Sequence, residues 1–243
     1  HTPEDRRFGN EEDLRFLMTH LGHDTGNQMM SLFIHFDNFS KGKKESENLE
    51  QAKTYLEHTY YIYKSMIDLP RGFNFEPETL EAISLLERLS KLNPKYQTLN
   101  LLEDKIFKVR NAHSVIYLQL YNFLKNSAEH SFRNTQKPSE ERIITFGAEV
   151  FPISEDELKY LGRNSQFYQK GNEFVRAYVG DNGYGIPEED LEKIFERKPS
   201  TSENGVGLSL VDWVCDKIHG WASVESEVGR GSEFSLYFAR NRI

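Results

Sequence analysis

The chain has 243 residues, of which 37% are hydrophobic, and its formal net charge at pH 7 is −8. This length fits one large domain or two ordinary ones, and no apolar run approaches the roughly 18 residues that a membrane-spanning helix requires. The single cysteine, Cys215, excludes a framework of intrachain disulfides, and the acidic balance without a dense Lys/Arg stripe argues against a nucleic-acid-binding surface.

The first region, from about residue 10 to residue 67, has helical periodicity throughout. Apolar residues recur at spacings of three and four along a first helix, and again along a second helix after the break at Lys41 and Gly42. The second helix carries its apolar seam at Leu49, Ala52, Leu56, Tyr60, Tyr63 and Ile67. Because two helices have too little core to bury both seams, we expect a dimeric four-helix bundle built from residues 1–70 of two chains. Packing of the hairpin against the rest of the chain is the alternative.

The stretch LGHDTGNQMM, residues 21–30, places a polar group within the first of these helices. His23 and Asp24 are adjacent, Asn27 follows His23 by four residues, and two glycines flank them. Residues four apart share one face of a helix, and His23 lies off the apolar seam, so it points toward solvent. Taken alone, the group is more simply explained as a solvated surface histidine beside an acid.

The turn LPRGFNFEPE, residues 69–78, ends the hairpin and places a domain boundary between residues 1–70 and residues 71–243. Beyond it, the periodicity predicts helices over Thr79–Leu92 and Ala112–Phe132. Alternating apolar residues predict strands over residues 142–150, 173–181, 221–228 and 233–240. The short connection between the last two favours a largely antiparallel or mixed sheet with helices on one face, and hence an α+β protein.

Two motifs in this second region place polar side chains where a ligand could bind. The predicted helix contains NFLKNSAEHS, in which Asn122 and Asn126 are four residues apart and share one face. The stretch VGDNGYGIP has Asp181 at the end of a strand, followed by Gly183 and Gly185 in a turn. An Asn amide oxygen can ligate Mg²⁺, and a buried Asp can accept a hydrogen bond from an exocyclic amine such as that of adenine. The plain alternatives are surface amides and an ordinary turn.

Two further motifs contain paired glycines. The polar loop KIFERKPSTSENGVGLSLV passes through Gly205 and Gly207 into a helix, and SEVGRGSEFSLYF has Gly229 and Gly231 between two strands. A glycine-rich loop that leads into a helix N-terminus exposes backbone N–H groups to phosphate oxygens. Glycines in a hairpin such as VGRGSE are more often structural than functional.

The order of these motifs carries a resemblance to a known family. An Asn-rich helix followed by DNGYGI, KIF, GVGLSL and GRGSEF resembles the ATP-binding domain of sensor histidine kinases, an α/β sandwich of the Bergerat or GHKL type shared with gyrase and MutL. The segment KIHGWASVESEVGRGSEFSLYF is similar to the closing segment of that domain, and LGHDTGNQMM resembles the phosphoacceptor motif of the dimerisation domain. The resemblance covers nearly the whole chain in the family's order.

The resemblance implies a role for each matching residue. Asn126, with Asn122 nearby, would hold Mg²⁺, while Asp181 would recognise the adenine of ATP. Gly183 and Gly185 would let the backbone approach the base closely. The mobile lid over the triphosphate would end at Gly205, Val206, Gly207 and Leu208.

Three positions depart from the family's pattern. Glu129 stands where a phosphate-contacting Lys is common, Glu203 stands where another lid glycine is usual, and Gln28 replaces a Pro that often kinks the first helix. These departures affect the expected affinity for nucleotide and the expected closure of the lid.

Hydrolases of the superfamily commonly place a water-activating Glu four residues before the metal-binding Asn. This chain has Asn122 there, and an amide cannot act as a general base. Asp24 offers a base elsewhere, because a carboxylate beside His23 can accept the Nδ1 proton and leave the Nε2 lone pair free to attack a γ-phosphoryl group. The resemblance associates Asn27 with removal of phosphate from the partner.

We therefore expect the core of a two-component histidine kinase. It would transfer phosphate from Mg-ATP to His23, pass it to an aspartate of a response-regulator receiver domain, and act as a homodimer in the cytoplasm. The polar start HTPEDRRFGN, without Met, suggests a fragment of a longer sensor, with no membrane contact of its own. The alternatives are a non-catalytic ATP-sensing scaffold and, less favoured, an ATP hydrolase.

Overall fold

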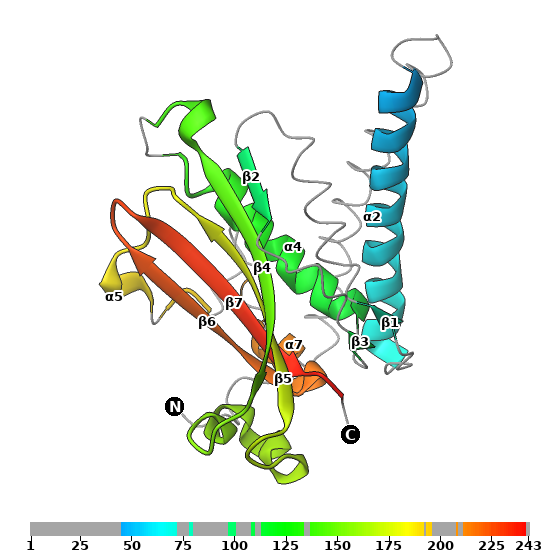
Figure 1. The fold of residues 1–243 in the computed structure, drawn as a ribbon, viewed down its shortest axis with the longest axis vertical. Coiled ribbons are helices and arrows are strands. Elements are labelled where there is room, and N and C mark those ends of the chain that lie inside the picture. The colour runs from blue at the N-terminus through cyan, green and yellow to red at the C-terminus, as the bar shows by residue number, and fades with distance from the viewer. Residues whose placement is uncertain are drawn as a thin grey trace.

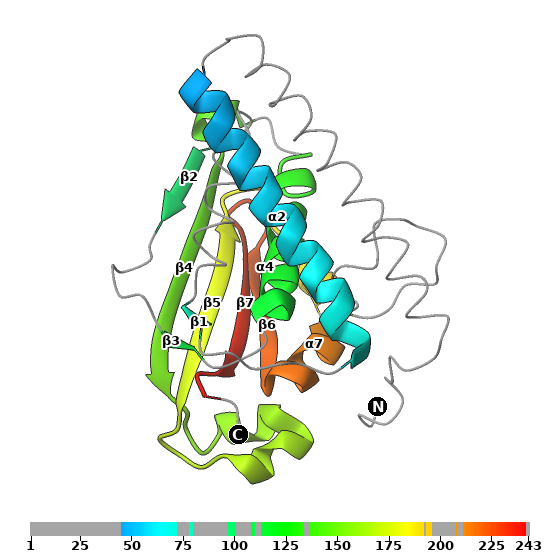
Figure 2. The ribbon, with the colours of Figure 1, turned by 90° about the vertical axis from the view of Figure 1, so that its right-hand side faces the viewer.

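The computed structural model describes residues 45–71, 78–79, 97–100, 108–109, 113–133, 137–191, 193–195, 208 and 211–241. Its described elements form three layers (Figures 1 and 2): a sheet, the helices α4 (His113–Glu129) and α7 (Val211–Ile218) on one face of it, and α2 (Glu45–Arg71) outside α4. Among the described helices, none combines the length and the apolar character that crossing a membrane requires.

The main sheet has five strands in the order β2-β4-β5-β7-β6. Their bounds are Gln97–Asn100 for β2, Ile143–Pro152 for β4, Glu173–Asp181 for β5, Gly220–Glu227 for β6 and Gly231–Ala239 for β7. β2 pairs parallel with β4, and the other three pairs are antiparallel. The prediction of a mixed sheet with helices on one face is therefore confirmed.

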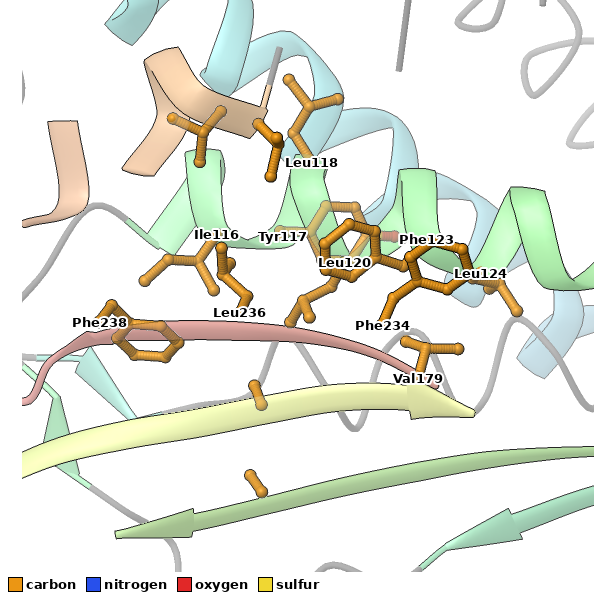
Figure 3. Close-up of a cluster of buried hydrophobic side chains, with 14 of the residues drawn as sticks. Ile116, Tyr117, Leu118, Leu120, Phe123, Leu124, Val179, Phe234, Leu236 and Phe238 are labelled. Atoms are coloured by element: carbon orange, nitrogen blue, oxygen red, sulfur yellow. The ribbon is translucent and has the colours of Figure 1, made fainter. Parts of the chain in front are cut away.

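The core lies between α4 and the inner face of this sheet (Figure 3). α4 turns Ile116, Leu120 and Phe123 toward the sheet, at the spacing of one helical face. The alternate residues of β7, Phe234, Leu236 and Phe238, meet them, with the Phe123 and Phe234 rings stacked at 5.3 Å between centroids. Each of these side chains is at most 3% exposed, and burial of one such side chain contributes roughly 1.5–3 kcal/mol.

The described elements differ from the prediction at several places. β2 (QTLN) is a short, largely polar edge strand, and its sequence lacks the apolar alternation that marks the other strands. Thr79 belongs to β1 (Glu78–Thr79), which pairs with β3 (Lys108–Val109), so the predicted start of a helix at Thr79 is wrong; residues 80–92 lie outside the described residues. The short helices η2 (Ser139–Glu141), η3 (Glu157–Phe167) and α5 (Glu188–Leu191) were not predicted.

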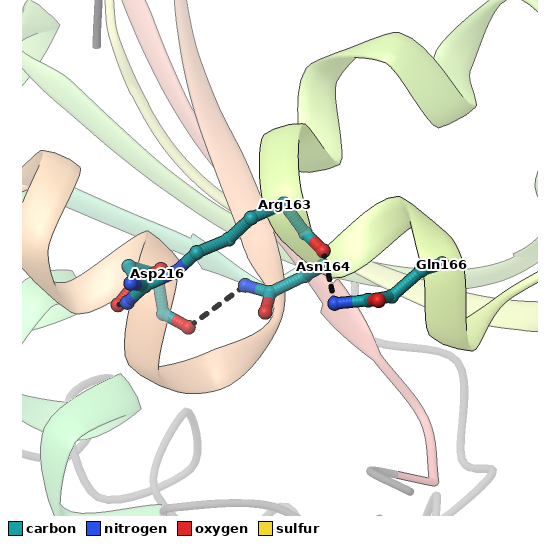
Figure 4. A network of polar contacts seen from close by, with 4 residues as sticks. All are labelled: Arg163, Asn164, Gln166 and Asp216. Atoms are coloured by element: carbon teal, nitrogen blue, oxygen red, sulfur yellow. Dashed lines mark hydrogen bonds and ion pairs between the residues drawn. The ribbon is translucent and has the colours of Figure 1, made fainter. Parts of the chain in front are cut away.

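The segment η3 joins β4 to β5 and contacts the end of α7 at one end of the sheet (Figure 4). Arg163 forms a two-pronged ion pair with Asp216, and Asn164 Nδ2 donates to the Asp216 carbonyl oxygen at 3.0 Å. Tyr168 adds a hydrogen bond of 2.9 Å between its hydroxyl and His219 Nδ1. These contacts hold the C-terminal end of α7, the helix that follows the predicted lid.

α2 confirms the second predicted helix. One of its faces is packed against α4, and another is exposed. His58 and Tyr61 pack against α4, so packing against the rest of the chain occurs through this face. The predicted seam is mostly open: Leu49, Leu56, Tyr60 and Tyr63 are 49–58% exposed, whereas Ala52 is buried. The first helix of the hairpin lies outside the described residues.

Candidate functional site

The carboxylate of Asp181 is the centre of the candidate site. Asp181 ends β5, between its partners Ile144 of β4 and Ser232 of β7. Its Oδ2 accepts a hydrogen bond from Ser131 Oγ at 2.8 Å, and its Oδ1 accepts one from the Gly183 N–H at 2.9 Å. Burial raises the pKa of Asp181, and these two donors oppose the rise. The result is a half-buried hydrogen-bond acceptor at the end of a strand.

Ser127 extends the set of donors around this carboxylate. It follows Phe123 by one turn on the sheet-facing side of α4 and is completely buried. Its hydroxyl lies close enough to lower the pKa of Asp181, although its oxygen makes no hydrogen bond within the described part of the chain. Ser127 and Ser131 belong to the NSAEHS motif, yet no pattern in the chain indicates that they lie near Asp181.

The two glycines after Asp181 permit close contact with other backbone segments. A Cβ on Gly183 would lie 2.6 Å from Ser131 Cβ, and Tyr184 N donates to the Ser131 carbonyl oxygen at 2.8 Å. Gly185 has φ +83°, and a Cβ there would lie 2.7 Å from the Glu227 carbonyl carbon. Both glycines are thus required by the fold of the loop itself; their predicted closeness to a base stays a prediction.

The β6–β7 hairpin holds this loop from the other side. Ser226 Oγ accepts from the Ile186 N–H at 2.8 Å and donates to the Gly231 carbonyl oxygen at 2.8 Å. Gly231 has φ +110°, and a Cβ there would lie 2.8 Å from Asn182 Cα. The Gly229 N–H donates to the Tyr184 carbonyl oxygen at 2.6 Å. The glycines of GRGSEF therefore have the structural role that was the plain alternative, and they serve the Asp181 loop.

The Asn pair lies on α4, the helix that leads into Ser131. Asn122 and Asn126 precede Phe123 and Ser127 by one residue each, so they flank the sheet-facing row of the helix. Asn122 is buried and Asn126 is half-buried. The Asn126 carbonyl oxygen accepts the Ser131 N–H at 3.4 Å, which places this turn directly before the residue that binds Asp181. Amide oxygens of this kind suit a hard cation such as Mg²⁺ that shares its other ligands with phosphate and water.

Basic groups surround the C-terminal end of α4. The pKa of His130 is lowered, first by burial and then by the charges of Arg133 and Lys125, while Glu129 raises it. Lys137 Nζ donates to the carbonyl oxygen of Asn182, the residue after Asp181, at 2.7 Å. The positive potential that acts on His130 suits an anionic ligand, and the negative charge of Glu129 works against it.

The remaining predicted site residues are only partly described. Leu208 is half-buried and packs against the main core, whereas Gly205, Val206 and Gly207 lie outside the described residues. His23, Asp24 and Asn27 also lie outside them. Within the residues that are described, no group of three or more His, Cys, Asp or Glu side chains could hold a metal ion.

Asn182 is a residue of the Asp181 loop that the sequence did not single out. Its side-chain Oδ1 accepts the Ile143 N–H at 2.9 Å, and its Nδ2 donates to the Glu141 carbonyl oxygen at 2.8 Å. It therefore joins the loop after β5 to the start of β4. Its position in Asp-Asn-Gly, a common turn composition, was the available signal.

Known proteins resemble this chain in sequence. A family model described as "Histidine kinase-, DNA gyrase B-, and HSP90-like ATPase" matches residues 114–242. The "Probable C4-dicarboxylate sensor kinase" of Halalkalibacterium halodurans is 35% identical over 103 residues, which are 41% of this chain and 19% of that protein. The "Signal transduction histidine-protein kinase ArlS" of Staphylococcus haemolyticus is 24% identical over 205 residues, 79% of this chain and 38% of that protein. The chain thus spans well under half of either relative.

Two solved structures resemble the chain in fold. The catalytic domain of the histidine kinase ThkA has a TM-score of 0.50 at 19% identity, and the match covers 70% of this chain and 97% of that chain. Full-length ShkA in complex with AMPPNP has a TM-score of 0.50 at 15% identity, covering 92% of this chain and 46% of that chain. At such identities the likeness concerns the fold alone, and it agrees with the predicted ATP-binding sandwich.

Proposed function

This chain belongs to the family of histidine kinase-, DNA gyrase B- and HSP90-like ATPases, and from that membership we propose that it is the catalytic core of a two-component sensor histidine kinase. Residues 71–243 would bind Mg-ATP, and residues 1–70 would form the dimeric hairpin that receives the phosphoryl group. The observation that carries the proposal is the half-buried carboxylate of Asp181, which Ser131 and Gly183 hold at the end of the helix that contains the Asn pair.

In this proposal each site residue has a defined task toward the nucleotide. Asp181 accepts a hydrogen bond from the exocyclic amine of adenine. Burial disfavours its charged form and raises its pKa, and an N–H donor on the ligand offsets that cost. Asn126 and Asn122 hold Mg²⁺, which when bound neutralises phosphate charge and orients the triphosphate. The backbone from Gly205 to Leu208 closes over the phosphates.

The phosphoacceptor is His23. Its Nε2 attacks the γ-phosphorus, the bond from that phosphorus to the bridging oxygen breaks, and ADP leaves with the electron pair. Asp24 takes the Nδ1 proton of the imidazole as the new N–P bond forms. The phosphoryl group then passes to an aspartate of a response-regulator receiver domain, and the sensor-kinase names of the relatives support this partner.

The decisive experiment incubates the chain with γ-labelled ATP and Mg²⁺ and tests the stability of the label. We expect an acid-labile, base-stable label on His23, which is lost in His23→Gln. His20→Gln is the matched control, because His20 lies on the same predicted helix without an adjacent acid. Equal labelling of His23→Gln and the parent would exclude His23 as the acceptor.

A second candidate, an ATP-sensing scaffold that transfers no phosphate, is favoured by one feature. Glu129 is exposed at the end of α4 and opposes the positive potential there. This candidate expects saturable nucleotide binding without any labelled histidine. Glu129→Lys should then strengthen nucleotide binding yet still produce no label, whereas a kinase should label in both forms.

Dimerisation belongs to the same proposal. The exposed apolar face of α2, Leu49, Leu56, Tyr60 and Tyr63, supports a second copy as its partner. Light scattering on the full chain should give twice the mass of one chain, and Leu56→Glu with Tyr60→Glu should shift it to the monomer. A parent that is monomeric at micromolar concentration contradicts this part.

Asn27 is proposed to assist dephosphorylation of the regulator. An amide cannot take a proton, but it can orient a water molecule for in-line attack on phospho-aspartate, and loss of such an orienting group commonly costs about 10²–10³ in rate. Asn27→Ala should therefore label His23 nearly as well as the parent while dephosphorylating the cognate regulator more slowly. The opposite pattern would reverse the roles of Asp24 and Asn27.

A further inference from the structure

A histidine that the proposed reaction does not use lies buried between α2 and α4. His58 is 0% exposed, and its Nδ1 is hydrogen-bonded to the hydroxyl of Tyr117. Its ring lies 4.5 Å from the ring of Tyr121 and 5.6 Å from that of Tyr117, between centroids. One turn further along α2, Tyr61 stacks on Tyr117 at 4.8 Å. The contact between the hairpin helix and the ATP-binding domain is therefore built on one imidazole enclosed by phenols.

This environment accepts only the neutral imidazole. His58 Nε2 has no hydrogen-bond partner among the described residues, and the groups that face the ring from α4 are the uncharged phenols of Tyr117 and Tyr121. On α2 itself, the hydroxyl of Thr54 is occupied by the Glu50 carbonyl oxygen. A protonated ring would have N–H donors on both nitrogens, and the second donor would be buried without an acceptor. Among the described residues no carboxylate compensates the charge, since burial is the cause that lowers the pKa of His58, from 6.5 to about 3.

We propose that the α2–α4 contact is an acid-sensitive latch, in which protonation of His58 releases the hairpin helix from the ATP-binding domain. The released imidazole is solvated and takes up a proton near its ordinary pKa, whereas the docked imidazole stays neutral. Docking is therefore fully stable above about pH 6.5 and weakens as the pH falls below that value, by up to about tenfold for each pH unit. The latch stands on this contact alone; an effect of release on the labelling of His23 would rest on the proposed function.

The test measures release by amide hydrogen exchange of the full chain without nucleotide. Between about pH 7.5 and about pH 5.5, corrected for the intrinsic exchange rate, the protection of residues 49–63 in α2 should fall about tenfold. A released α2 loses the packing that supports most of its helical stability. The protection of β5 and β7 should stay constant, which shows that the sheet remains folded. Constant protection of α2 over this range would overturn the latch.

Three variants assign the effect to its residue. His58→Phe keeps an aromatic ring at the contact but cannot take up a proton, so its α2 protection should not change with pH. His130→Gln is the matched control, a half-buried histidine elsewhere on the described chain, and it should behave as the parent. Tyr117→Phe removes only a hydroxyl, so it should loosen docking at about pH 7.5 while the dependence on pH persists.

Two results with these variants would refute the latch. A pH dependence that survives in His58→Phe would assign the release to another group. If α2 of His58→Phe fails to dock even at neutral pH, the criterion becomes the change of α2 protection with pH in Tyr117→Phe. Constant protection in that variant refutes the proposal. None of these readouts requires ATP, so a chain that never labels His23 still gives a clear answer.

Discussion

The Asp181 loop and the β6–β7 hairpin offer a stringent test, because one glycine of each shares a backbone conformation with the other but not its surroundings. Gly185 has φ +83° and Gly229 has φ +86°. A Cβ on Gly229 would meet no atom within 4 Å, whereas a Cβ on Gly185 would lie 2.7 Å from the Glu227 carbonyl carbon and 3.1 Å from Val228 Cα. The pair Gly185→Ala and Gly229→Ala therefore separates conformational strain from steric collision.

The magnitudes follow from these distances. Alanine in the left-handed region costs about 1–2 kcal/mol, and this is the whole expected effect of Gly229→Ala. Carbon atoms normally pack about 3.5–4.0 Å apart, so Gly185→Ala must displace the hairpin backbone by roughly 0.8 Å or more. Such overpacking typically adds about 1–3 kcal/mol, which gives a total of about 2–5 kcal/mol for Gly185→Ala.

Urea unfolding of both variants and the parent measures the free energy of unfolding from the midpoint and the slope. Gly185→Ala should be less stable than Gly229→Ala by about 1–3 kcal/mol. It should also weaken the binding of a fluorescent ATP analogue more, because the displaced hairpin holds the Asp181 loop. If the two variants are equally stable within about 0.5 kcal/mol, the close approach of Gly185 to β6 is not as described here.

Three further substitutions test the site and the core. Asp181→Asn should weaken Mg-ATP binding by roughly tenfold or more in a nucleotide titration. It should also keep or raise the melting temperature at about pH 7. Burial raises the pKa of this carboxyl, so its charged form lowers the stability of the fold above the folded pKa. The advantage of the amide should therefore vanish as the pH falls through that pKa. Phe123→Ala should lower the free energy of unfolding by about 3–5 kcal/mol in urea, because it empties a fully buried space against Phe234. Arg163→Ala should lower it by less than about 1 kcal/mol, since the arginine that pairs with Asp216 is 74% exposed.

One helix organises most of the described molecule. α4 packs its Phe123 side on the sheet and its Tyr117 side on α2, and it leads into Ser131, which binds Asp181. The proposed latch and the candidate site therefore share this helix.

Local patterns in the sequence predicted most of the longer elements and one stretch of the candidate site. The alternation in β5 and β7 and the helical spacing in α4 predict burial because a residue's face depends only on its neighbours in the chain. Asp181, Gly183 and Gly185 were singled out because they lie within one short motif. The resemblance to histidine kinases rested on the order of such short motifs, and the family match over residues 114–242 agrees with it.

The tertiary structure alone decided which polar residues are buried and what they bind. His58 is a polar residue on a helix, and its burial follows from Tyr117, 59 residues later in the chain. Ser226 lies in a hairpin, and its hydroxyl receives the N–H of Ile186, 40 residues earlier. The polar strand β2 exists because it pairs with β4, and nothing in its own residues favours that pairing. Local periodicity reports only which face a side chain takes, whereas most buried polar groups are hydrogen-bonded, and the partners of these residues are distant in the chain.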